Sequence, residues 1–232
     1  MFSSGYMMYY ILAGALSLVG MLVSNRLKSK FNHYSQFNLQ NGMTGREVAE
    51  AMLRHYNIHD VKIVPAKGTL TDHYNPLTKT VALSEPVYNS RSIAAAAVAA
   101  HECGHAVQHD TAYSWLKMRS AIVPFVKYAS MAQQYLLMFA LGAFGIGGGE
   151  TILFITIIAF AITTLFSLIT LPVEFDASKR ALVWLDETGT TTATEHEGAK
   201  DALWWAAMTY VSAALSSLVI LLFLILRYAS SD

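Results

Sequence analysis

Four stretches of this chain contain no charged side chain over a length that could cross a lipid bilayer. They are Gly5 to Asn25, Tyr128 to Gly149, Thr151 to Val173, and Ala202 to Leu226. A membrane-spanning helix needs about 20 mostly apolar residues. Only 14% of the residues are charged, against about 25% in an ordinary soluble domain. We therefore predict a multi-pass protein of the cell membrane, although Gln133-Gln134 makes the second span the weakest.

The positions of the basic residues predict the orientation in the membrane. Of the sixteen Lys and Arg, twelve lie between Arg26 and Lys127, three lie between the third and fourth predicted spans, and only Arg227 lies elsewhere. By the positive-inside rule, the first two groups face the cytoplasm. Both chain ends and the turn at 145–150 then face outward. The first span lacks a basic segment before it, which favours an uncleaved anchor over a signal peptide.

The segment after the first span has the patterns of a small α+β domain. Thr44-Gly45-Arg46-Glu47 is a capping-box pattern, and it predicts a short helix running to about Tyr56. Val61 to Val64 predicts a strand. Leu70 to Tyr74 and Lys79 to Leu83 flank a turn sequence and predict a β-hairpin. The outer edge of this hairpin could bind an extended peptide by strand addition, or the hairpin could simply cover the core.

His101-Glu102-Cys103-Gly104-His105 is the stretch with the clearest chemistry. It follows an alanine-rich run that predicts a helix. Residues four apart share a helix face, so His101 and His105 can bind one zinc ion, with Glu102 placed to take a proton from zinc-bound water. A chance match of this pattern occurs in on the order of one such chain in a hundred, so the motif needs a third ligand to support it.

Glu174 is the better candidate for that third zinc ligand. Pro172 suits a helix start, and two predicted crossings between His105 and Glu174 would return the chain to the same side of the membrane. The other acidic and histidine candidates on that side are Glu195, His196 and Glu197. However, Thr194 and Glu197 also fit a capping box that opens the last helix.

Several nearby residues receive supporting or neutral interpretations. His109 lies too far along the helix to be a ligand, so we place it near the ligands or on the surface. The lone Cys103 excludes an internal disulfide, fits a reducing compartment, and is interpreted as a packing residue. The oxyanion-stabilising donor stays open among Arg180, His73 and His196. The net charge of zero gives no indication of nucleic-acid binding.

Several segments carry a resemblance to a known family. They are Thr71-Asp72-His73-Tyr74, the stretch from Leu83 to Ile93, the stretch from His101 to His109, Pro172 to Ser178, and Ala206 to Val211. Together they resemble the YugP-like family of bacterial membrane zinc metallopeptidases, and more distantly the HtpX-type membrane gluzincins. The resemblance implies His101, His105 and Glu174 as zinc ligands and Glu102 as catalytic base. Ser178 stands where the HtpX pattern has Asp, so Asp176 or Ser178 would support a ligand histidine instead.

These observations predict a mainly α, α+β fold. It has four transmembrane helices and a small cytoplasmic α+β zincin-like domain that carries HExxH on a helix. The expected organisation is a first transmembrane helix at 5–25, the zincin-like domain at 26–127, a transmembrane hairpin at 128–173, a cytoplasmic helix with the third ligand at 174–201, and a last transmembrane helix at 202–227.

The predicted function is that of a zinc-dependent endopeptidase (cofactor Zn2+) acting on membrane-associated or unfolded proteins near the bilayer. One alternative is a non-catalytic zinc-binding membrane scaffold or partner subunit, for which Glu102 would have no use. A metal transporter is a weaker alternative, because the predicted spans contain no Asp, Glu, His, Lys or Arg to line a metal path.

Overall fold

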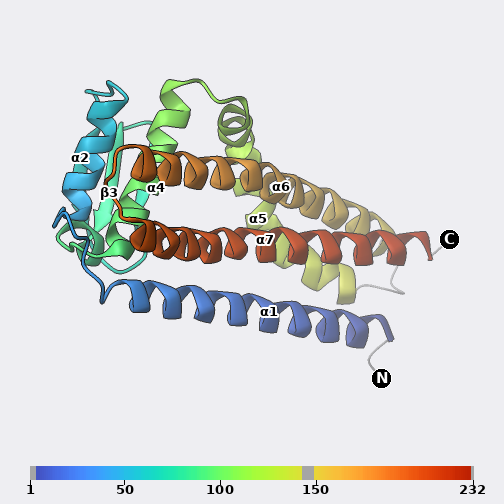
Figure 1. Cartoon of the computed structure of the whole chain (residues 1–232). Helices are drawn as coiled ribbons and strands as arrows, with labels where there is room; N and C mark the ends of the chain where they lie inside the picture. Colours follow the sequence, from blue (N-terminus) through green and yellow to red (C-terminus); the bar gives the residue numbers. More distant parts are fainter. Residues whose placement is uncertain (1–3, 143–148, 231–232) are drawn as a thin grey trace. The chain divides into compact units, whose positions relative to one another are not determined.

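The computed structural model describes residues 4–142 and 149–230. The protein is mainly helical with one small sheet (Figure 1). The elements are α1 Ser4–Tyr34, α2 Gly45–His55, β1 Lys62–Ala66, β2 His73–Asn75, β3 Thr80–Ser84, α3 Glu85–Tyr88, α4 Ile93–Asp110, α5 Ser114–Gly142, α6 Gly149–Glu187 and α7 Ala193–Ala229. They form two compact units, and α6 and α7 each contribute residues to both.

The first unit consists of residues 1–23, 118–171 and 209–232. Its apolar cluster is centred on Leu153 and Phe160 of α6 and Leu224 of α7, with Leu137 of α5 packed against it. The Thr163 hydroxyl of α6 also lies 3.2 Å from the Gln133 side-chain oxygen of α5. This unit therefore collects the apolar parts of the four long helices.

Within the described residues, three helices are long and apolar enough to cross a membrane. They are Met7–Tyr34, Gly149–Glu187 and Ala193–Ala229. The predicted second span, 128–149, is not among them, and its residues 143–148 lie outside the described residues, so three candidate spans are found where four were expected. The corresponding helix α5 carries Lys117, Arg119 and Lys127 as well as Gln133, which interrupt its apolar run. The predicted external turn at 145–150 lies mostly outside the described residues.

Helix α6 is long enough to contain both a membrane-spanning stretch and a polar stretch that carries Glu174. Its 39 residues correspond to about 58 Å at about 1.5 Å per residue, whereas a hydrocarbon core is about 30 Å thick. Pro172 lies inside this helix, so its prediction as a helix start is wrong. Since Pro172 lacks an N–H, the helix loses one backbone hydrogen bond there, a loss that long apolar helices tolerate.

The second unit consists of residues 24–117 and 172–208. Its sheet has the order β1-β3-β2, with β1 parallel to β3 and β2 antiparallel to β3. The predicted hairpin is confirmed, with Tyr74 opposite Val81. The parallel pairing of β1 with β3 was not predicted, and it leaves β2 at the sheet edge.

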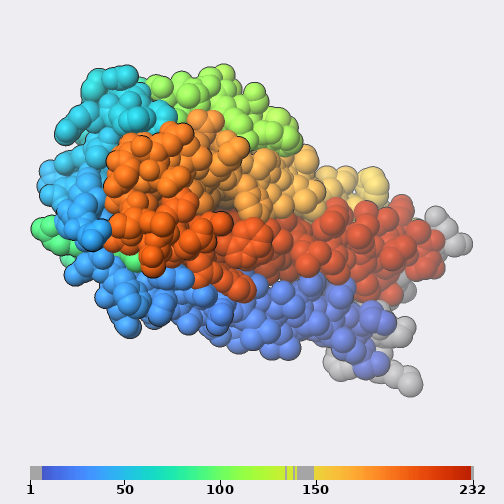
Figure 2. All heavy atoms as spheres, in the orientation of Figure 1, coloured from blue at the N-terminus to red at the C-terminus, as the bar shows by residue number. Residues whose placement is uncertain are grey.

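The core of the second unit forms around the alanine-rich half of α4. Residues Ala94 to Ala97 are fully buried, and their small side chains let α2 pack closely through Val48 and Met52. The predicted capping box at Thr44 and Glu47 is confirmed at the start of α2. Trp184 of α6 joins the same core. In the space-filling view, the orange residues at the end of α6 and the start of α7 form one continuous packed surface (Figure 2).

Helix α7 starts slightly earlier than predicted. The carboxylate of Glu195 accepts hydrogen bonds from the Thr192 amide and hydroxyl, at 2.7 and 2.9 Å. The Glu195 amide in turn donates to the Thr192 hydroxyl at 3.4 Å. The capping box is therefore Thr192 with Glu195, and the predicted pairing of Thr194 with Glu197 is wrong by two residues.

Candidate metal centre

His101, His105 and Glu174 converge in the second unit. The Nε2 atoms of His101 and His105 lie 3.3 and 3.6 Å from the same oxygen of Glu174, Oε2. Within the described ranges 4–142 and 149–230, this is the only group of three potential ligands whose donor atoms all lie within 4.8 Å of one another. The three residues that the motif and the resemblance single out therefore meet at one point.

The spacing of these donor atoms fits a tetrahedral zinc ion. Zinc lies about 2.0 to 2.2 Å from nitrogen and oxygen ligands, so two tetrahedral ligand atoms are separated by about 3.4 Å. The two measured nitrogen-to-oxygen distances, 3.3 and 3.6 Å, bracket this value. Two neutral imidazoles and one carboxylate also form a donor set that zinc accepts in catalytic sites. The residues present thus fit a zinc ion in donor type and in two of their three separations.

Helix α4 presents the two histidines to each other. Ser92 caps its start by accepting a hydrogen bond from the Ala95 amide at 3.2 Å. His101 and His105 lie one turn apart further along, and their rings are 4.8 Å apart and nearly perpendicular. The helical spacing alone therefore brings both Nε2 atoms to one side of α4.

Gly104 allows α6 to approach this face of α4. A Cβ atom at Gly104 would lie only 2.6 Å from the Ala177 carbonyl oxygen, closer than real Cβ contacts. Ala177 follows Glu174 by about one turn of α6, so the close contact holds Glu174 near the histidines. The glycine within the motif is therefore required by the crossing of the two helices.

The Nδ1 atoms of the two histidines have their own partners. His101 Nδ1 lies 3.1 Å from the Ser178 hydroxyl, and His105 Nδ1 lies 3.0 Å from the side-chain oxygen of Gln108. Ser178 thus contacts His101 directly. Asp176 contacts neither histidine in these bonds and instead accepts from Gln108 and Arg180, at 2.8 and 2.6 Å. Both imidazoles are oriented so that their Nε2 atoms face Glu174.

Glu102 is buried next to the first histidine. It is 8% exposed, and burial raises the pKa of its carboxyl group, while the neighbouring His101 and His105 act in the opposite direction. A carboxyl group with a raised pKa is better matched to proton transfer near neutral pH.

The other candidate residues lie apart from this group. The Nδ1 atom of His109 is 2.8 Å from the Tyr74 hydroxyl. Glu195 serves as a helix cap and also accepts from the Gln40 amide at 2.6 Å, and Glu197 lies near Lys200 on the surface. His196 is likewise outside the group of three.

The candidates for an oxyanion-stabilising donor have partners of their own. The Nε atom of Arg180 donates to Asp176, and the guanidinium lies 5.7 Å from the centre of the Tyr113 ring. His73 Nδ1 lies 2.9 Å from the Thr71 carbonyl oxygen. The contacts of Arg180 and His73 therefore single out neither residue as the donor.

Cys103 is part of the packed interior. It is fully buried, and its thiol donates to the Ala49 carbonyl oxygen at 3.6 Å. Burial raises the pKa of the Cys103 thiol, so very little of it ionises near neutral pH. This agrees with its interpretation as a packing residue.

Sequence reasoning missed the roles of Gln108 and Gly104. Gln108 follows His105 by three residues, so the helical period already places both side chains on one face. Gly104 is a costly residue inside a helix, which is itself a sign of close packing. Their partners on α6 are separated from them by more than sixty residues, and only the fold identifies those partners.

Two comparisons with known proteins find matches. Residues 9–229 match the family model described as "Putative neutral zinc metallopeptidase". The chain is 43% identical over 197 residues to the "Putative membrane protease YugP" of Bacillus subtilis (strain 168), covering 85% of this chain and 86% of that protein. No solved structure matches. With three apolar helices, this relation indicates a multi-pass membrane protein. The chain belongs to the neutral zinc metallopeptidase family that the matching description names.

Proposed function

We propose that this protein is an integral membrane zinc endopeptidase whose site faces the cytoplasm and hydrolyses peptide bonds of membrane-associated or unfolded proteins. The observation that carries the proposal is the convergence of His101, His105 and Glu174 beside the buried Glu102. A purely structural zinc site usually has four protein ligands and no use for an adjacent carboxylate. Three ligands with a neighbouring base are the arrangement of a catalytic site.

In the proposed reaction each side chain has a separate task. A zinc ion held by the three ligands would polarise the peptide carbonyl and lower the pKa of a water molecule. Glu102 accepts the proton of the attacking water and passes it to the nitrogen of the leaving amine. Ser178 and Gln108 hold the two imidazoles in place through their Nδ1 atoms.

The edge strand β2 supports binding of an extended peptide. It pairs with β3 on one side only, because the strand order leaves β2 at the edge of the sheet. Backbone groups at such an edge can bind an added strand with little dependence on its sequence. This fits a substrate that is unfolded locally, whatever its side chains.

The cytoplasmic orientation rests on charge. Fifteen of the sixteen basic residues lie between Arg26 and Lys127 or between Lys179 and Lys200. The positive-inside rule places such segments in the cytoplasm. The second unit, which contains the metal centre, carries most of these residues.

Substitution of Glu102 tests the proposed function. The full chain, purified in detergent and loaded with zinc, should cleave a fluorescently labelled unfolded protein, and Glu102→Gln should reduce the rate by about 10² to 10⁴. Zinc content should stay unchanged, because Glu102 is not a ligand in the proposal. Glu50→Gln, on α2, is the matched control and should keep full activity. A zinc-loaded wild type without activity, together with normal cellular function of Glu102→Gln, would favour the scaffold alternative.

A further inference from the structure

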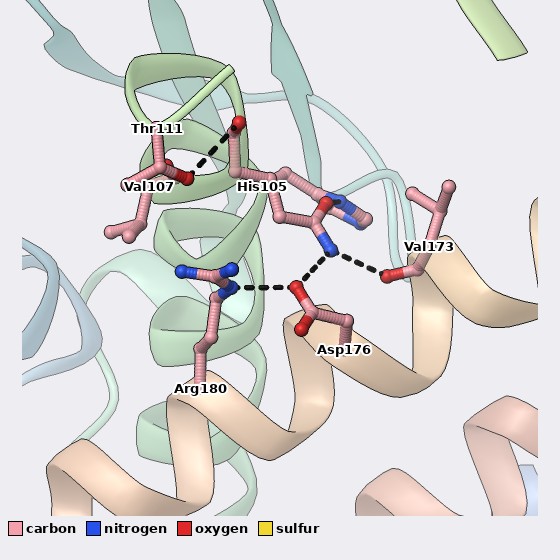
Figure 3. Close-up of polar contacts among 7 residues, drawn as sticks. His105, Val107, Thr111, Val173, Asp176 and Arg180 are labelled. Atoms are coloured by element: carbon pink, nitrogen blue, oxygen red, sulfur yellow. Dashed lines mark hydrogen bonds and ion pairs between the residues drawn. The ribbon is translucent and has the colours of Figure 1, made fainter. Parts of the chain in front are cut away.

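Gln108 forms the centre of a polar network between α4 and α6. Figure 3 shows its partners His105, Val173 and Asp176, together with Arg180. The Gln108 side chain is fully buried. The amide nitrogen Nε2 lies 2.7 Å from the Val173 carbonyl oxygen and 2.8 Å from Oδ2 of Asp176, and the amide oxygen lies 3.0 Å from His105 Nδ1. We propose, building on the proposed zinc site, that Gln108 selects the protonated nitrogen of His105 and so keeps its Nε2 lone pair available for the metal.

The orientation of the Gln108 amide follows from its surroundings. An amide side chain can be turned by half a rotation with little change in shape, so its orientation must come from its hydrogen bonds. The Val173 carbonyl and the Asp176 carboxylate can only accept hydrogen bonds. If the amide were turned round, its oxygen would face both acceptors and two hydrogen bonds would be lost. Nε2 therefore faces α6, and Oε1 faces His105.

This orientation determines where the proton of His105 resides. The Oε1 atom can only accept, so His105 Nδ1 must donate to it and carry the proton. The other nitrogen, Nε2, then has a free lone pair, and it is the atom that lies 3.6 Å from Glu174 Oε2. A metal-binding imidazole needs this state, with the second nitrogen donating to an acceptor.

His101 lacks an equivalent constraint. Its Nδ1 partner is the hydroxyl of Ser178, at 3.1 Å, which can either donate or accept. Ser178 is therefore compatible with both neutral forms of His101. The two ligand histidines differ in this respect, so loss of Gln108 should affect the metal more than loss of Ser178.

Asp176 acts through Gln108. Its Oδ2 atom receives hydrogen bonds from Gln108 Nε2 and from Arg180 Nε, the latter at 2.6 Å. The ion pair with Arg180 fixes the carboxylate, which in turn fixes the amide. Asp176 and Gln108 are thus positioning residues, and neither touches the metal.

The test measures the nitrogen protonation of His105 and the zinc affinity of the full chain in detergent. In the zinc-free wild type, nitrogen-15 NMR of labelled histidine should show a proton on Nδ1 of His105, where Gln108 accepts it. In Gln108→Leu, Nδ1 has no acceptor while the Glu174 carboxylate still faces Nε2, so the proton should move to Nε2, and zinc should bind about 10- to 100-fold more weakly. Ser178→Ala, as the matched control, should lose less zinc affinity than Gln108→Leu.

A double variant separates positioning from helix packing. Gln108→Glu combined with Asp176→Asn exchanges the amide and the carboxylate, so residue 108 can still accept from His105 and residue 176 can donate to it. This variant still lacks the donor to the Val173 carbonyl, so it should restore the protonation of His105 at Nδ1 but only part of the zinc affinity. It also keeps the proposal testable if Gln108→Leu does not fold, which thermal unfolding would reveal.

Two outcomes would overturn the inference. One is a folded Gln108→Leu with wild-type His105 protonation and zinc affinity, and the other is a double variant that behaves no better than Gln108→Glu alone. Neither readout requires peptide cleavage. A wild type that binds zinc through this network but cleaves nothing would refute the proposed function alone, whereas an active wild type with an unaltered Gln108→Leu would refute this inference alone.

Discussion

Replacing Gly104 by alanine should weaken zinc binding from a position that contacts no ligand atom. The added Cβ would lie 2.6 Å from the Ala177 carbonyl oxygen, whereas ordinary contacts begin at 3.4 Å. The two helices would therefore have to separate by about 0.8 Å to relieve the overlap. Glu174 precedes Ala177 on α6 and would move with it. Metal sites tolerate errors of only about 0.2 Å in ligand distance.

The size of the effect follows from overpacking. An added methyl group in a well-packed contact costs about 1 to 3 kcal/mol. The gain in helix propensity from Gly to Ala returns about 0.5 to 1 kcal/mol, but it is present with and without zinc. If the zinc-free helices separate to relieve the overlap, zinc binding must bring them back together, and the cost of the overlap is then taken from the binding free energy. A cost of 1 to 3 kcal/mol corresponds to about 5- to 150-fold weaker zinc binding.

Competition against a coloured chelator, with full-length protein in detergent, measures this change. Gly14→Ala in α1 is the matched control, because nothing lies within 4 Å of a Cβ placed there. It should leave zinc affinity unchanged. Wild-type zinc affinity and wild-type thermal stability in Gly104→Ala would show that α4 and α6 do not approach this closely, and the reasoning would fail.

Four further substitutions have expected outcomes. Glu174→Ala and His105→Ala should each weaken zinc affinity by more than the roughly 10- to 100-fold loss expected for an outer partner, so metal analysis should find less bound zinc. Full zinc occupancy in both variants would remove the proposed site. Thr44→Ala should destabilise the protein by about 0.5 to 2 kcal/mol in thermal unfolding, because the Thr44 hydroxyl accepts the hydrogen bond of the Glu47 amide at the start of α2, and an unchanged midpoint would argue against the cap. A cysteine placed at the exposed Lys67 should be labelled by an impermeant reagent only after the cytoplasmic side is opened; labelling of intact cells would reverse the proposed orientation.

Local patterns in the sequence predicted local structure well. The capping box at Thr44 and the hairpin that pairs Tyr74 with Val81 are both confirmed. Each depends only on residues within a dozen positions of one another, so a local pattern was enough to predict it. The cap of α7 was misplaced by two residues, since Thr192 and Thr194 each precede an acidic residue by three positions. Spacing alone could not choose between them.

Features that depend on distant residues were harder to predict. The crossing count used for Glu174 assumed two spans after His105, but α5 is not among the apolar candidate spans in the described residues. Glu174 nevertheless lies at the histidines, because α6 continues through Pro172 as one helix and meets Gly104. Hydropathy describes each helix separately and contains no information on such a crossing.

The burial of Cys103 has a practical consequence for experiments on this protein. Its thiol is fully covered by side chains of the folded second unit, and its raised pKa keeps it in the unreactive form. The natural chain therefore already serves as a background for site-directed labelling. A single introduced cysteine, or a pair carrying spin labels, should report from its own position without any change to the residues between His101 and His105.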